Sequence, residues 1–434
     1  MKEEFLHYLW KFRLLNLDLK TLAGDPVVVL QPGDHNTDGG PDFFNARVKI
    51  GETIWAGNVE IHISSSDWFR HGHQYDKAYE NIILHVVYQF EINPDMLQIL
   101  TIPTLEIMNQ FPNKIQYQYE LLMHNNFRIP CTNLINAELQ SEFSLWTPSL
   151  IMERFLEKCE EIRRNWESCD YDWEETLYRF LATNFGFRIN ALSFELLAKS
   201  LPLKLIKRHI GNIIQLEALL FGQSGLLNTD YTDTYPVLLS SEYCFLKNKY
   251  GIIPISGVTW KFLRLRPSNF PTIRISQLAS FIQSTGGRFF QLLESSSLRE
   301  IQSSFDLLAS PYWDDHFLFD RLSPKRVKLM GKSSKSLLII NGVVPFLFFI
   351  GLEKGIATYR EKAINLLESI SAEKNIDIDR WKKVGLEANN ALQTQALIQL
   401  KRAYCDKKRC LECRLGIKIL QYKIDSDNLK NQIP

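Results

Sequence analysis

One stretch, residues 37–88, restricts what this chain can fold into more than any other part of its sequence. Asp42 and Glu60 lie there with 17 residues between them, about the length of a tight antiparallel hairpin. Strands rise roughly 3.3 Å per residue, so Asp42 can begin one strand while Glu60 lies near the middle of its partner. Carboxylates that close repel each other unless a cation lies between them. The spacing therefore predicts a metal site.

Apolar periodicity predicts a mixture of helices and strands around this pair of carboxylates. The expected order is a helix over 2–15, strands over 27–30, 43–50 and 54–63, a helix from Ser66 or Asp67 to Tyr79, a strand over 81–90 and further β structure over 99–107. Because side chains alternate along a strand, Glu60 and His62 share one face of the strand over 54–63, opposite Val59 and Ile61.

This order, with Pro41-Asp42 before one strand and Glu60-Ile61-His62 on the next, resembles the core of the PD-(D/E)xK nuclease superfamily. The resemblance covers roughly residues 1–95, and His62 stands where the superfamily usually has lysine. The residues GGPDFFNARV…GNVEIH…SDWFRHGH…ILHVV also resemble a family of uncharacterised bacterial proteins known only as a domain of unknown function.

The nuclease resemblance implies a role for each of the matching residues. Asp42 and Glu60, helped by the carbonyl of Ile61, would hold Mg²⁺ or Mn²⁺, since hard divalent ions prefer oxygen ligands. His62 would orient or deprotonate a water molecule that attacks a nucleic-acid phosphodiester. Glu3 or Glu4 in the first helix could supply a further carboxylate. If the exchange of lysine for His62 has silenced the chemistry, nucleic-acid binding alone is expected.

Histidines support a competing interpretation. Five of the nine lie between residues 35 and 85, and imidazole is a preferred ligand of Zn²⁺. The competing hypothesis is a zinc hydrolase. Its expected ligands are His35, Asp42, His71 and His73. A third alternative is a non-enzymatic scaffold or interaction protein, in which the polar groups only satisfy buried hydrogen bonds.

A cysteine cluster near the C-terminus is a second candidate metal site. Cys405, Cys410 and Cys413 lie within nine residues, a spacing typical of thiolate ligands, and Cys131 is the candidate fourth ligand. Structural Zn²⁺, a 4Fe–4S cluster and free thiols all remain open. The odd count of seven cysteines, without an export signal, predicts a reducing cytoplasmic location.

Beyond about residue 134 the apolar residues recur with the period of a helix. We therefore expect two domains: a nuclease-like domain over 1–135, and a mainly helical domain over 136–434 that ends in the cysteine cluster. The fold class is α+β or α/β, with a restriction-endonuclease-like mixed sheet core followed by mostly α-helical structure. The expected helices cover 138–166, 173–184, 190–200, 203–221, 275–283, 289–294, 298–305 and 381–404.

Charge is divided unevenly along the chain. Residues 1–95 carry 14 acidic and 8 basic residues, or −6, which leaves +7 for the remainder of a chain of net charge +1. A basic, aromatic-rich stretch over 260–274 favours nucleic acid as the partner, through Arg264, Arg266 and Arg274. The most apolar segment, residues 337–352, is shorter than the roughly 20 residues of a membrane span, so a buried core segment and no membrane contact are expected. The oligomeric state stays open.

Overall fold

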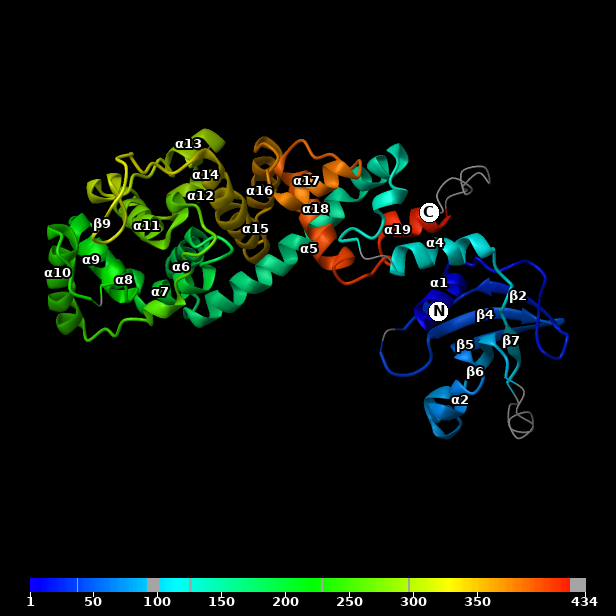
Figure 1. The fold of residues 1–434 in the computed structure, drawn as a ribbon. Helices are drawn as coiled ribbons and strands as arrows, with labels where there is room; N and C mark the ends of the chain where they lie inside the picture. The colour runs from blue at the N-terminus through cyan, green and yellow to red at the C-terminus, as the bar shows by residue number, and fades with distance from the viewer. Residues whose placement is uncertain (37, 92–101, 125–126, 228, 296, 422–434) are drawn as a thin grey trace. The chain divides into compact units, whose positions relative to one another are not determined.

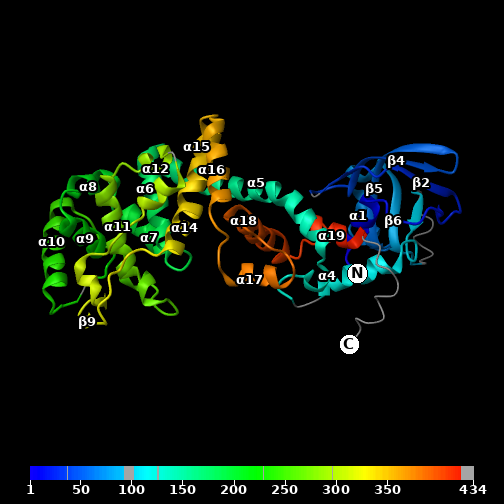
Figure 2. The ribbon, with the colours of Figure 1, turned by 90° about the horizontal axis from the view of Figure 1, so that it is seen from above.

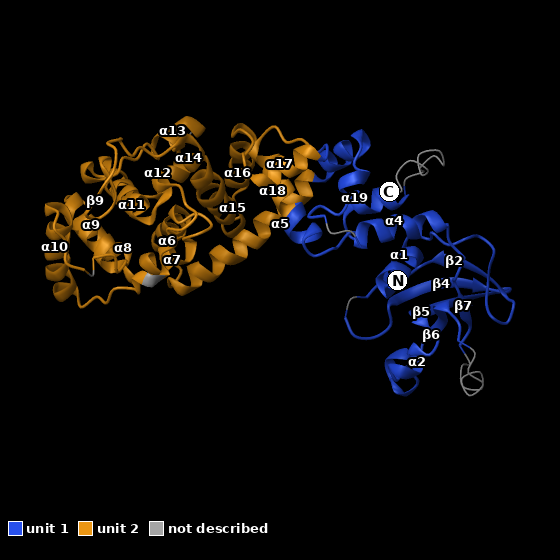
Figure 3. Cartoon of the chain, in the orientation of Figure 1, with its two compact units in different colours: residues 1–146, 384–386, 400–434 blue, residues 147–383, 387–399 orange. Residues whose placement is uncertain are grey.

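The computed structural model describes residues 1–36, 38–91, 102–124, 127–227, 229–295 and 297–421. They form two compact units, coloured separately in Figure 3. Unit 1 comprises residues 1–146, 384–386 and 400–434, and unit 2 comprises residues 147–383 and 387–399. The division therefore falls at residue 146 rather than 135. The cysteine-bearing C-terminal segment belongs to the first unit, whereas the sequence had suggested the second.

Unit 1 is built on a mixed sheet with the strand order β1-β2-β4-β5-β6-β7 and with β3 paired to β4. The strands are β1 Leu19–Lys20, β2 Pro26–Gln31, β3 Asp34–His35, β4 Phe43–Ile50, β5 Thr53–Ser64, β6 Ile82–Gln89 and β7 Thr104–Glu106. β4 pairs antiparallel with β2 and β5, whereas β6 pairs parallel with β5 and β7. The predicted mixed sheet is confirmed, although residues 99–101 of the last predicted strand lie outside the described residues.

Helices complete unit 1 beside this sheet. They are α1 Glu3–Lys11, α4 Asn113–His124, the start of α5 Ala137–Ser168, the π-helix η9 Lys401–Cys405 and α19 Arg414–Gln421. α1 lies against β5, as Figures 1 and 2 show, because its apolar stripe is buried on one side. Phe5 of α1 stacks on Tyr119 of α4 with ring centroids 4.2 Å apart.

The segment between β5 and β6 differs from the single helix expected over 66–79. It forms only α2 Asp67–Arg70, followed by the 3₁₀ turns η1 His73–Tyr75 and η2 Lys77–Tyr79. Gly72 has φ +76°, a left-handed conformation that ends a right-handed helix. No side chain caps the start of α2: Ser66 makes no capping hydrogen bond, and the Asp67 carboxylate accepts the N–H of Ser64.

Unit 2 is mostly helical, as the sequence predicted. Its elements include most of α5, α6 Trp173–Phe185, α7 Ala191–Ser200, α8 Leu203–Ile206, α9 Ile213–Gln223, α10 Thr234–Tyr250, α11 Pro271–Thr285, α12 Phe290–Glu294, α13 Leu298–Ser303, α14 Lys332–Leu338, η8 Ile339–Val343, α15 Val344–Glu353, α16 Ala357–Ser369, α17 Ile376–Lys383 and α18 Ala391–Leu400, with a short hairpin of β8 His316–Leu318 and β9 Arg321–Leu322. The continuous helix over 332–353 is long and apolar enough to cross a membrane, but 72% of its apolar window is buried inside the protein, as in the core helix of a soluble protein.

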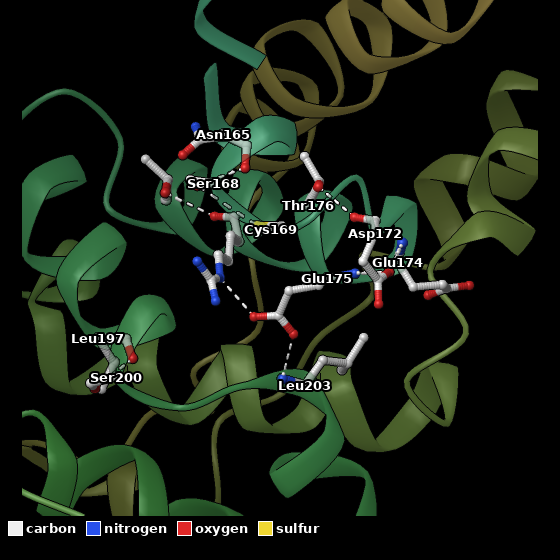
Figure 4. A network of polar contacts seen from close by, with 12 residues as sticks. Asn165, Ser168, Cys169, Asp172, Glu174, Glu175, Thr176, Leu197, Ser200 and Leu203 are labelled. Carbon is white, nitrogen blue, oxygen red and sulfur yellow. Dashed lines mark hydrogen bonds and ion pairs between the residues drawn. The ribbon is translucent and has the colours of Figure 1, made fainter. Parts of the chain in front are cut away.

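Side-chain hydrogen bonds at helix starts connect neighbouring helices of unit 2, and Figure 4 shows one such network. The Asp172 carboxylate accepts the N–H groups of Glu174 and Glu175 and so caps α6. Glu175 in turn accepts the backbone N–H of Leu203 at 2.7 Å, at the first residue of α8, and pairs with Arg179 at 2.6 Å. One carboxylate thus ties α6 to α8.

Two helical predictions for residues beyond 200 need correction, and helices there were also missed. The helix expected over 203–221 is broken at Asn212, whose side chain caps a new helix, α9. The helix expected over 381–404 is divided into α17, α18 and η9, with Gly385 at φ +93° in the break. α10 was missed, because its mixed polar and apolar residues lack an amphipathic period.

Candidate metal centre

The structure brings Asp42 and Glu60 together across the β4–β5 pair. The backbone N–H of Asp42 donates to Glu60 Oε2 at 3.1 Å, and the N–H of Ile61 donates to Asp42 Oδ2 at 2.9 Å. Each carboxylate is therefore anchored by the backbone of the neighbouring segment. The N–H and C=O groups of one strand residue point toward the same neighbouring strand. The Ile61 carbonyl therefore points toward the side of Asp42, as the Ile61 N–H does.

A β-bulge adjoins the two carboxylates. The β4–β5 register shifts between Phe43 and Ala46, and Asn45 has φ +57° there. Its backbone N–H donates to the side chain of Asn58 at 3.3 Å. A bulge turns the preceding part of a strand away from regular pairing, and it is a common feature beside functional sites. It lies shortly after Asp42, and Phe43 between them keeps its pairing with Val59.

Three imidazoles gather beside Glu60. The ligand atoms of His62, His71 and His73 all lie within 4.8 Å of one another. Glu60 Oε1 lies 3.3 Å from His73 Nε2 and 3.5 Å from His62 Nε2. His62 comes from β5, whereas His71 and His73 flank Gly72, so the break in the predicted helix is what brings both imidazoles to one place.

Neighbouring side chains hold these rings in place. His62 Nδ1 lies 2.9 Å from Nε2 of the fully buried His85 on β6. If His62 donates in this bond, its Nε2 keeps a free lone pair on the side of Glu60, which is the tautomer that a metal ligand needs. Tyr79 stacks on His73 with ring centroids 3.9 Å apart. His62 and His73 are thus supported by neighbouring rings, whereas His71 is exposed.

α1 contributes two more groups, one of them missed by sequence reasoning. His7 Nε2 lies 3.2 Å from Asp42 Oδ2. Glu3 is close enough that the Asp42 carboxylate, after burial, raises its pKa. Of the two glutamates expected near the site, Glu3 is therefore the one that lies near Asp42. Glu3 and His7 are four positions apart, a spacing that places them on one helix face, and this was the available signal for His7.

Electrostatics at the centre disfavour charge of either sign. Burial, followed by the Asp42 carboxylate, raises the pKa of Glu60 to about 9. Burial and the neighbouring imidazole of His85 lower the pKa of His62 to about 2. Burial and His71 lower the pKa of His73. At neutral pH His62 and His73 are therefore neutral, the form that binds metal ions, and a cation beside Glu60 would favour ionisation of its carboxyl group.

Buried nitrogens without hydrogen bonds support the same conclusion. His7 Nε2, His73 Nε2 and His85 Nδ1 make no hydrogen bond, although carboxylate oxygens lie near the first two. Buried polar atoms are nearly always paired, and each unpaired one costs roughly 1–3 kcal/mol. His73 Nε2 beside Glu60 and His7 Nε2 beside Asp42 therefore fit as ligands of a transition-metal ion such as Zn²⁺.

The other predicted ligands are placed differently. His35 of the proposed zinc set lies beside His7, with ring centroids 5.4 Å apart, and outside the group of three imidazoles. Arg264 and Arg266 are exposed. Arg274 is buried, and its guanidinium donates to Gln277 and Asn269, so the proposed contact between Arg274 and nucleic acid needs correction. Cys405, Cys410 and Cys413 are buried in unit 1.

Comparison with known proteins identifies the family. The family model described as "Protein of unknown function (DUF2851)" matches residues 3–376. The chain belongs to the DUF2851 family. The match includes each member of the candidate metal centre, from Glu3 to His85, and it ends before Cys405. No curated protein and no solved structure matches the chain. The expected membership in a family of unknown function is thus confirmed, and the DUF2851 description carries no activity.

Proposed function

We propose that the chain is a metal-dependent hydrolase of nucleic-acid phosphodiesters. The observation that carries the proposal is the group of His62, His71 and His73, whose ligand atoms lie within 4.8 Å of one another beside Glu60. Three imidazoles favour Zn²⁺ or a similar ion over the Mg²⁺ that two carboxylates alone would select. Such an ion polarises a phosphoryl oxygen and lowers the pKa of a bound water.

Each side chain has a defined place in this proposal. His62, His71 and His73 would hold the ion, and His85 would fix the ring of His62. Glu60 is placed to accept a proton at Oε1, the oxygen nearest His73 and His62. Asp42 Oδ2 is fixed by the Ile61 N–H and is placed either to complete the ligand set or to orient His7.

The sheet topology supports phosphodiesters as the substrate. An N-terminal helix, an antiparallel pair that carries both carboxylates and a parallel strand reached through α2 follow the element order of the PD-(D/E)xK core. We infer a restriction-endonuclease-like core that has exchanged the usual lysine for an imidazole cluster. This exchange replaces a fixed positive charge by metal ligands, so ion binding becomes the main source of positive charge at the site.

Cleavage assays with the full-length chain test the proposal. Plasmid DNA, single-stranded DNA and RNA are incubated with Zn²⁺, Mn²⁺ or Mg²⁺. Cleavage is expected with Zn²⁺ or Mn²⁺, and Glu60→Gln or His73→Ala should slow it by ~100-fold or more. His124→Ala, which removes an exposed histidine at the end of α4, is the matched control. Cleavage that is unchanged in both site variants, or ion binding without cleavage of any of these polymers, would overturn the proposal.

A further inference from the structure

Four of the seven cysteines lie in unit 1 and are separate from the imidazoles and carboxylates of the candidate metal centre. Cys131 follows α4, Cys405 ends η9, and Cys410 and Cys413 precede α19. All four are buried and none forms a disulfide. Although 274 positions separate Cys131 from Cys405, both belong to the same compact unit. Local sequence keeps Cys405, Cys410 and Cys413 together, and the fold brings Cys131 into the same unit.

Contacts place the cysteine loop beside the end of α4: Lys408 Nζ donates to the carbonyl oxygen of Met123 at 3.5 Å, and α19 packs against α4. The pKa shifts of the thiols agree with this placement. Burial raises the pKa of Cys405, and the thiols of Cys131, Cys413 and Cys410 raise it further. Burial, followed by Cys413 and Cys410, raises the pKa of Cys131 in the same way. Interactions between charges fall with distance, so these shifts agree with the contacts in placing Cys131 near the C-terminal cysteines.

The backbone around α19 is arranged to support a thiolate. Cys413 accepts backbone hydrogen bonds from Gly416 and Leu415 in the first turn of α19. A Cβ on Gly416 would lie 2.0 Å from the carbonyl oxygen of Cys410, so only glycine allows the cysteine loop to close onto the helix. N–H donors directed at a cysteine sulfur stabilise its ionised form.

We propose that Cys131, Cys405, Cys410 and Cys413 bind a thiolate-ligated metal centre that joins the C-terminal segment to the sheet unit. Four thiolates complete the ligand set of a zinc ion or of an iron–sulfur cluster and leave no open position, so the centre is structural. Binding releases the thiol protons. Among the described residues, the group of three donors within 4.8 Å of one another is the histidine one, so the thiols are spaced more widely. A zinc ion would draw them together, whereas a cluster would not.

Metal analysis of the full-length chain, purified anaerobically without chelator, tests the centre. Zinc or iron in stoichiometric amount is expected, and iron would be accompanied by acid-labile sulfide and visible absorption. Cys131→Ser and Cys410→Ser should lose this metal. Cys159→Ser, which removes a buried thiol in α5, should retain it, and so should His73→Ala. The last variant separates this centre from the histidine site.

A second measurement covers the case in which the serine variants fail to fold. The wild-type chain, stripped of metal under reducing conditions, is reconstituted with Co²⁺, and sulfur-to-cobalt charge-transfer absorption is expected in the near ultraviolet. Chelation should also increase the number of thiols that react with an alkylating agent. Absence of zinc and iron together with absence of the cobalt signal would overturn the proposal. So would metal content that is equal in the cysteine variants and the wild type, or disulfides between these four cysteines.

Discussion

At the scale of single residues, Glu60 determines how the candidate metal centre responds to protons and metal ions. Its pKa is raised from 4.5 to about 9, so between these values the folded chain holds a proton that the unfolded chain has released. The free energy of unfolding of the metal-free protein therefore falls as pH rises. His62 has a lowered pKa and gives the opposite slope, but only below its ordinary value of 6.5.

Glu60→Gln should remove this loss of stability. From pH 7 to 9 the metal-free variant is expected to gain ~2 kcal/mol over the wild type, because no buried carboxyl group has to ionise. With Zn²⁺ present the order should reverse, since the variant loses the carboxylate beside the ion. Urea denaturation with and without metal measures both effects. Glu52→Gln, at an exposed turn, is the control, and equal pH slopes in Glu60→Gln and wild type would contradict the prediction.

Arg274 is expected to affect stability rather than nucleic-acid binding. Its guanidinium is buried, donates to Gln277, Asn269 and Ser334, and lies 4.8 Å from the ring centroid of Phe187. Arg274→Ala leaves these partners unpaired and should cost ~3 kcal/mol in the free energy of unfolding. Arg266→Ala, at an exposed position, should stay within ~0.5 kcal/mol. Chemical denaturation compares the two, and equal losses would show that burial of Arg274 is unimportant.

These residues show what the sequence could predict about the site. The spacing of Asp42 and Glu60 and the alternation along β5 correctly predicted two neighbouring carboxylates with His62 on the same face as Glu60. Burial was not predictable from alternation, because both faces of β5 around Glu60 are covered. Arg274 shows the same limit, since a basic, aromatic-rich stretch has the same composition whether its arginine lies at the surface or in the core.

At the scale of elements, the helix break at Gly72 brings His71 and His73 to the candidate metal centre. Helical periodicity over 66–79 predicted one continuous helix, yet the left-handed residue ends α2 and returns the chain, so that His71 and His73 reach His62. The apolar pattern did not reveal this, because a glycine inside a helical pattern is tolerated in many helices. The strands were predicted more closely: β4 has the predicted bounds, since its residues alternate between buried and exposed positions for most of its length.

Gly72→Ala tests this role of the turn. No atom lies within 4 Å of the added Cβ, so the cost comes from φ +76° alone and is expected to be ~1 kcal/mol. The variant should fold but bind Zn²⁺ at the histidine centre more weakly, because relief of the left-handed residue moves His71 and His73. Titration of Zn²⁺ into the Cys410→Ser background isolates this centre. Gly24→Ala, another left-handed glycine with open space, is the control. Unchanged zinc affinity would show that the turn does not position the ligands.

At the scale of the whole molecule, the chain crosses between its units more often than the sequence indicated. A change from strand-like to helix-like apolar periodicity near residue 134 predicted one domain boundary. The first boundary between the units in the structure lies near there, at residue 146. The return of residues 400–421 to unit 1 left no compositional signal, because α19 is an ordinary amphipathic helix whose partner, α4, lies far away in sequence. Contacts so distant along the chain are fixed by packing rather than by local pattern.

A chain that stops after residue 399 should therefore lose stability in unit 1 alone. It lacks α19, whose Leu415, Ile419 and Leu420 are buried, and three of the four clustered cysteines. Calorimetry should show the unit 1 transition lowered by ~10 °C or more and the unit 2 transition in place. A chain that stops after residue 421 keeps α19 and is the control. One shared transition that moves as a whole would show that the two units do not unfold separately.

Because unit 1 is formed from segments far apart in the chain, it can complete its fold only late in translation. The first 146 residues leave the ribosome early, but the segment that completes their packing is translated only after unit 2. Domains fold as they emerge, so the helical unit is ready to fold before the sheet unit has all of its parts. A nascent chain thus carries a full set of histidines and carboxylates without the last helix of their unit, and only the finished polypeptide can close that unit around them.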